Sequence, residues 1–102
     1  MAGPGLHVDK LANLQTSRFV WVGGRLTVDD RTLEFHPNAP NRALNAGVLD
    51  VVVPLDEVER VELAGGFVTT KVRVVGRRGE VVVRCYGARG VVETLRRLTG
   101  AA

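Results

Sequence analysis

Apolar and polar residues alternate along most of this chain, and the alternation predicts a protein built mainly of β-strands. The clearest case is the stretch from residue 23 to 37, GGRLTVDDRTLEFHP. Leu26 and Val28 lead into a turn at residues 29–31, and apolar residues alternate again on the way out. Aspartate is common in such turns because its side chain can bond the neighbouring backbone. We therefore predict a β-hairpin with one buried face and regard it as the centre of the fold.

The same pattern predicts strands on both sides of this hairpin. Residues 18–22 form a compact aromatic and β-branched run, whereas residues 6–14 are only weakly extended. Within the first run, Trp21 is a core residue or an exposed anchor, and a core position is the preferred interpretation. Gly23 and Gly24 then allow a bend or a bulge. The remaining strands are predicted at residues 51–53, 61–63, 69–75 and 80–86, the last two joined by a turn at residues 76–79.

Two stretches depart from strand alternation before the chain ends. Asp56 and Glu59 have the spacing of a capping box, which suits one helical turn. The segment from residue 36 to 50 has two prolines, three asparagines and no sustained period. So long a segment is a mobile connection or a binding loop. In the second case, Arg42 and Leu44 would rest on a membrane or a partner.

The chain ends in a predicted amphipathic helix at about residues 88–99. Arg96 and Arg97 in its last turn suit the negative end of the helix dipole, and Gly100 is a natural stop. One face carries a stripe of apolar residues, Val91, Val92, Leu95 and Leu98. About seven strands and one helix predict a mainly β (α+β) fold, a bent antiparallel sheet or open barrel capped by the helix.

Length and composition are those of a single small domain. The chain has 102 residues and 45% hydrophobic residues, which argues against disorder throughout. Residues 1–10 are interpreted as a flexible N-terminal segment, without the features of a secretory signal, and residues 11–102 as the domain. No apolar run approaches the roughly 20 residues of a membrane span. A lone cysteine, Cys85, favours the reducing cytoplasm, with a location at the membrane periphery as the alternative.

Charge is distributed unevenly. Residues 1–62 carry a net charge of −3 and residues 63–102 a net charge of +6, together the +3 of the whole chain. The plainer interpretation is ordinary solvated strand faces. The alternative is that acidic and basic surfaces meet between copies of the protein. In strand alternation, Lys71 and Arg73 should point outward while Val72 and Val74 point inward.

Reaction chemistry is not evident in the sequence. His7, His36 and Cys85 are too scattered for a metal site, and Cys85 fits a small buried hydrophobe. The glycine pairs lack the lysine and the helix of a phosphate loop. Nucleic acid is disfavoured because most aromatic residues occupy apparent core positions. We therefore expect no catalysis and no cofactor.

In order, the stretches GGRLTVDDRTLEFHP, VVVPLDEVERVEL and TKVRVVGRRGEVVVRCY, with the closing helix, resemble a GRAM domain, a branch of the pleckstrin-homology-like (PH-like) fold. The resemblance covers about residues 12–98. It implies seven strands, a C-terminal helix, no catalysis, and binding of lipid headgroups or protein segments. The sequence departs from the family where PH domains bind phosphoinositides, because Lys10, Arg18 and Arg25 are scattered rather than clustered.

Two binding functions follow as hypotheses. The preferred one is a scaffold that engages a protein partner or a second copy of itself. The alternative is weak contact with an anionic membrane through a basic hairpin tip, with about 1 kcal/mol for each base. The candidate residues for a ligand or partner are Lys71, Arg73, Arg77, Arg78, Arg42 and Leu44.

Overall fold

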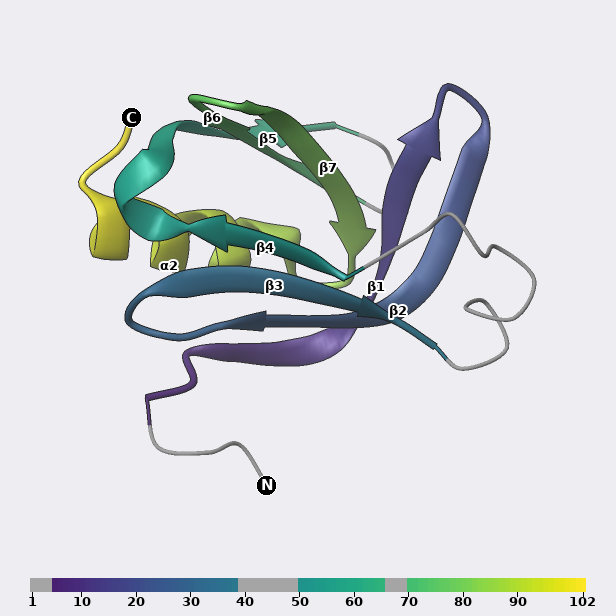
Figure 1. Cartoon of the computed structure of the whole chain (residues 1–102), viewed down its shortest axis with the longest axis horizontal. Helices are drawn as coiled ribbons and strands as arrows, with labels where there is room; N and C mark the ends of the chain where they lie inside the picture. The colour runs from purple at the N-terminus through teal and green to yellow at the C-terminus, as the bar shows by residue number, and fades with distance from the viewer. Residues whose placement is uncertain (1–4, 39–49, 66–69) are drawn as a thin grey trace.

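The computed structural model describes residues 5–38, 50–65 and 70–102, and within them the chain forms the predicted strands and one α-helix (Figure 1). A short 3₁₀ helix follows the fourth strand. The elements are β1 (Val8–Ser17), β2 (Val20–Val28), β3 (Thr32–Pro37), β4 (Val51–Pro54), η1 (Leu55–Glu57), β5 (Val58–Ala64), β6 (Thr70–Gly76), β7 (Gly79–Cys85) and α2 (Ala88–Thr99).

All strands pair antiparallel, in the order β4-β3-β2-β1-β7-β6-β5. Strand β1 pairs with β2 along its length but with β7 only around Asn13 and Leu14. The sheet therefore consists of two halves that meet at β1 and diverge on either side of it. Figure 1 shows the strands bending around one side, with α2 packed against that side. The predicted fold class, a bent antiparallel sheet capped by one C-terminal helix, is confirmed.

The core lies between the two halves of the sheet and α2. In the predicted hairpin, Leu26 of β2 lies opposite Phe35 of β3, and both are fully buried. From the other half, Val61 and Val72 are fully buried, as is Leu95 of α2. Burying one such side chain contributes about 1.5–3 kcal/mol, so these contacts hold the helix to the sheet.

Polar contacts position the turn of the hairpin and the end of the helix. The carboxylate of Asp29 accepts hydrogen bonds from the backbone N–H groups of Arg31 and Thr32, both at 2.7 Å. The two bonds lower the pKa of Asp29 below 3.8, and the bond from Arg31 has the larger effect. At the other end of the chain, the Arg96 guanidinium donates to the Val61 carbonyl at 2.8 and 3.1 Å, which ties α2 to β5. Gly100 ends the helix in the left-handed region, with φ of 71°.

Several predicted boundaries need correction. Strand β1 begins at Val8, so residues 8–10 belong to the sheet rather than to a flexible segment. Residues 18–19 form the turn between β1 and β2 instead of starting a strand. The bulge lies in β1 between Gln15 and Ser17, not at the glycine pair. Gly24 has another reason to be glycine, because a Cβ there would lie 2.6 Å from the Phe35 ring.

The predicted capping box is also wrong. The N-cap of η1 is Pro54, with no side-chain hydrogen bond to the cap, and Glu59 already belongs to β5. Most of the predicted binding loop, with Arg42 and Leu44, lies outside the described residues. Within the described ranges, no helix has the length and apolar character needed to span a membrane.

Candidate functional site

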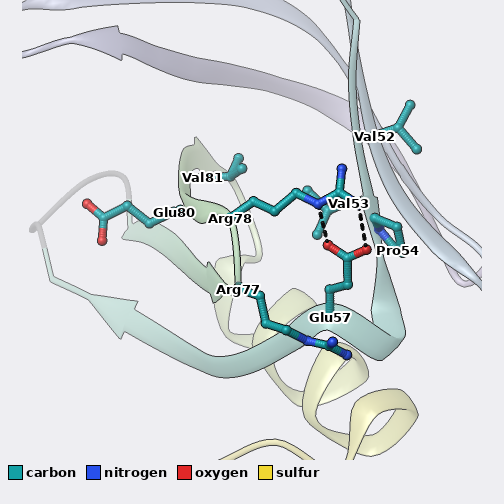
Figure 2. A pocket seen from close by; sticks show the side chains of 10 residues that line it. Val52, Val53, Pro54, Glu57, Arg77, Arg78, Glu80 and Val81 are labelled. Atoms are coloured by element: carbon teal, nitrogen blue, oxygen red, sulfur yellow. Dashed lines mark hydrogen bonds and ion pairs between the residues drawn. The ribbon is translucent and has the colours of Figure 1, made fainter.

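The predicted basic tip is the turn between β6 and β7, where Arg77 and Arg78 are both exposed. Arg78 Nε lies 3.1 Å from Glu57 Oε1, and a second Arg78 nitrogen, Nη2, donates to Glu57 Oε2 at 3.3 Å (Figure 2). Arg77 Nη2 donates to the carbonyl of Asp56 at 3.2 Å. A planar guanidinium that forms two bonds with one carboxylate is a well-matched pair. The charge of Arg78 is therefore matched by Glu57, while Arg77 is hydrogen-bonded to the backbone of η1.

A small hollow of about 160 Å³ separates this tip from strand β4. Its apolar lining comes from Val53, Pro54 and Val81, and the Arg78 side chain extends across it toward Glu57 (Figure 2). The space can hold one apolar group. Arg78, which crosses the hollow, is paired with Glu57, and this pairing weakens the attraction of the hollow for an anion.

The structure does not bring the other candidate residues to this tip. Lys71 and Arg73 point outward from β6, as predicted, while Val72 and Val74 are buried. Arg73 Nε lies 3.8 Å from Glu80 Oε2, so its charge is also matched. Lys71 lies at the opposite end of β6 from the tip.

Lys71 instead belongs to a cluster around Trp21, which sequence reasoning missed. The guanidinium carbon of Arg84 lies 4.4 Å from the centroid of the Trp21 ring, and Lys71 Nζ lies 5.6 Å from it. Trp21 is half-buried and lies outside the core cluster, so the preferred core interpretation is wrong. We call Trp21, Lys71 and Arg84 the Trp21 surface.

Strand register brings these three residues together on the outer face. Arg84 of β7 lies opposite Asn13 of β1 on one side and opposite Lys71 of β6 on the other. Trp21 lies on β2, opposite Gln15 of β1. A signal was present in the sequence, because Trp21 alternates with buried Val22, and Arg84 alternates with Val83 and Cys85.

The electrostatics of the Trp21 surface are unusual for a sheet. Like charges directly opposite each other on neighbouring strands destabilise a sheet, and Lys71 and Arg84 are such a pair. Among the described residues, no acidic side chain forms an ion pair with either of them. The electron-rich face of Trp21 offsets part of the repulsion, by roughly 0.5–1 kcal/mol for each exposed cation. The pair remains positive and partly exposed, which suits an anionic ligand.

The turn between β1 and β2 presents another aromatic residue. Phe19 is 84% exposed, and the Arg18 guanidinium lies 5.4 Å from its ring centroid. Tyr86, after β7, is 78% exposed. The prediction that most aromatic residues occupy core positions is therefore wrong for Trp21, Phe19 and Tyr86, and right for Phe35.

The remaining reactive side chains of the described residues are Cys85 and the histidines. Cys85 is buried, as predicted, and burial raises the pKa of its thiol against the opposing effect of Lys10. His36 lies between two carboxylates, 2.9 Å from Glu34 and 3.1 Å from Asp50. Within the described residues, no group of three or more histidine, cysteine or acidic side chains is placed to hold a metal ion.

Comparisons with known proteins concern the fold. No family model matches the chain, and no curated protein sequence matches it. Among solved structures, it is similar to the solution structure of the N-terminal PH domain of human ARAP2, with a TM-score of 0.72. The sequences are 12% identical, and the match covers 97% of this chain and 84% of the ARAP2 domain. The chain therefore has a PH-like fold.

Proposed function

We propose that this protein is a non-catalytic binding module of the GRAM/PH-like type that engages an acidic protein partner through the Trp21 surface. The observation that carries the proposal is the pair Lys71 and Arg84, two cations held directly opposite each other with no acidic partner among the described residues. Natural sheets avoid this arrangement unless another interaction compensates for it. A carboxylate-rich partner would supply that compensation.

The pairing of the other strand cations supports this choice. Arg25 pairs with Asp9, Arg60 with Glu62 at 3.6 Å, and Arg73 with Glu80. These pairs, with that of Arg78 and Glu57, use much of the acidic charge inside the chain. Of these pairs, only that of Arg78 and Glu57 joins the basic half of the sequence to the acidic half, so most of the positive excess of residues 63–102 is left unpaired by them. The Trp21 surface holds two of these cations side by side.

A membrane is the second candidate, and exposed Phe19 is the observation that favours it. The three bases available there are Lys71, Arg84 and Arg18, and each contributes about 1 kcal/mol at an anionic leaflet. Together they give about 3 kcal/mol, weaker than a millimolar dissociation constant. Membrane contact would therefore depend on insertion of Phe19, with the β1–β2 turn in place of the predicted β6–β7 tip. Either function fits a cytoplasmic protein.

Two matched double variants test the proposal. Lys71→Glu with Arg84→Glu reverses the Trp21 surface, and Arg77→Glu with Arg78→Glu reverses the hairpin tip by the same amount of charge. The probes are a fluorescent oligoglutamate peptide, phosphatidylserine-containing vesicles and a single-stranded oligonucleotide, all at low salt. We expect the wild type to prefer the peptide, and the Trp21-surface variant to lose about 100-fold or more in affinity.

Tighter binding of vesicles than of peptide would replace this proposal with the membrane function, and tighter binding of the oligonucleotide would replace it with a nucleic-acid function. Peptide binding that survives reversal of the Trp21 surface would reject the site.

A second copy of the chain is the alternative protein partner. Light scattering at two salt concentrations tests it, because a dimer held by this surface should dissociate as salt screens the charges.

A further inference from the structure

Next to the Trp21 surface, the outer face has a hollow of about 360 Å³. It lies where β1 and β7 separate, beyond their paired positions Asn13 and Arg84. On one side is Leu11, 68% exposed, and on the other is Tyr86, 78% exposed. Large apolar side chains left exposed around a concave surface mark an interaction site.

The hollow is built into the fold. Gly23 of β2 lines the hollow and lies opposite Asn13 of β1. Because Gly23 has no side chain, the hollow is deeper at this position. Lys10 Nζ donates to the carbonyl of Tyr86 at 3.2 Å, which ties the end of β7 to β1 beyond the last paired position. The separation of the two strands is thus held by a specific contact. A preformed site loses less free energy to ordering on binding.

The charge of the hollow is one-sided. Arg84 is the charged residue of its lining, which contains no acidic side chain. The same Arg84 lies over Trp21. The hollow and the Trp21 surface are therefore continuous, with cations at one end and exposed apolar side chains at the other.

Strand geometry sets the spacing that a ligand would need. Leu11 lies two residues along β1 from Asn13, the partner of Arg84, a distance of about 6.6 Å at about 3.3 Å per residue. Lys71 lies one strand beyond Arg84, about 4.8 Å across the sheet. An extended segment could therefore place an acidic side chain on the cations and another side chain, two residues away and on the same face, over the hollow.

We propose that the partner presents an extended segment in which a large apolar side chain follows or precedes its acidic residues by two positions. The acidic residues bind Lys71 and Arg84, and the apolar side chain fills the hollow between Leu11 and Tyr86. This inference rests on the proposed function, because it uses the same cations. It adds a second, apolar requirement that charge alone would not impose.

A random-peptide display library selected on the full chain tests the inference. The variants are Leu11→Ser with Tyr86→Ser for the hollow, Lys71→Glu with Arg84→Glu for the cations, and Val52→Ser on β4 as a control at another exposed apolar residue. We expect the wild type and the control to enrich acidic peptides with a large apolar residue at the stated spacing. The hollow variant should keep the acidic preference and lose the apolar one, and the cation variant should lose both.

For a synthetic peptide of the enriched sequence, the hollow variant should bind at least about tenfold more weakly, since one buried apolar side chain contributes about 1.5–3 kcal/mol. An apolar preference that persists in the hollow variant would overturn this inference and leave the proposed function standing. A wild type that enriches no acidic residues would overturn both.

Discussion

The hairpin formed by β6, β7 and the turn between them carries two pairs of basic residues, and the fold treats them in opposite ways. At the hairpin tip, Arg78 bonds Glu57 through two nitrogens and Arg77 bonds the carbonyl of Asp56. At the other end of the same hairpin, Lys71 and Arg84 lie directly opposite each other with Trp21 against both. The first pair braces η1 against the turn, whereas the second presents positive charge. A cation is a binding candidate when its surroundings leave its charge unmatched, and exposure alone is a poor guide.

The largest effect should come from disrupting the packing of α2 on β5 and β6, because both basic pairs depend on a folded sheet. Leu95→Asp places a charge at a fully buried position and should cost at least about 4 kcal/mol, a large part of the stability of a small domain. Chemical denaturation should show an unfolded or aggregated protein. The control is Glu93→Asp, a change at an exposed position of the same helix. An unchanged unfolding midpoint for Leu95→Asp would mean that the helix does not pack there.

A smaller change should make the tip resemble the Trp21 surface. Glu57→Gln removes the partner of Arg78, and should cost up to about 1 kcal/mol because Arg78 is highly exposed. The released cation should raise affinity for anionic vesicles about fivefold. Glu59→Gln is the matched control, since it removes an equal charge from an exposed position of β5. Equal gains in the two variants would show that net charge, and not release of Arg78, is responsible.

Removing the like-charge pair of the Trp21 surface should preserve or raise stability and weaken binding. Lys71→Glu replaces a repulsive cross-strand pair with an attractive one, while Arg84 keeps its place over Trp21. The free energy of unfolding should stay the same or rise by up to about 1 kcal/mol, and binding of an oligoglutamate peptide should fall. Urea denaturation and fluorescence anisotropy measure the two quantities. A destabilised variant would show that the like-charge pair is not a source of strain.

The smallest effect concerns His36, which is matched by carboxylates as Arg78 is at the tip. Burial alone would lower the pKa of His36, but hydrogen bonds to Asp50 and Glu34 outweigh it and raise the pKa above 6.5. Both ring nitrogens face carboxylates, so the arrangement requires the protonated ring. A raised pKa in the folded state means that the stabilisation is complete below about pH 6.5 and is lost as the pH rises through the folded value. Relative to His36→Gln, the wild type should be more stable at low pH, and this advantage should shrink above pH 6.5. A constant difference across that range would contradict the raised pKa.

Much of the fold could be predicted because the pattern of apolar and polar residues is strong in the central hairpin and in the C-terminal helix. Leu26 and Phe35 alternate with polar residues in the hairpin, and the helical stripe around Leu95 has a clear period. The errors fall where local signals are weak or misleading. The turn at residues 18–19 contains neither glycine nor proline, so an aromatic run concealed it.

The site was harder to predict, because it depends on register between strands far apart in the chain. Arg78 and Glu57 are 21 positions apart, and no local pattern indicates that they form an ion pair. Trp21 meets Lys71 and Arg84 only through the order β2-β1-β7-β6. The sequence shows where the cations are, but which of them are neutralised follows from the tertiary structure.

The most direct test of the contrast between the two basic pairs is an NMR titration of the ¹⁵N-labelled protein with an oligoglutamate peptide at low salt. We predict that the indole N–H of Trp21 and the backbone amides of Lys71 and Arg84 shift most, while the amides of Arg77 and Arg78 barely move. Shifts concentrated at Arg77 and Arg78, with an unmoved Trp21 indole, would contradict it.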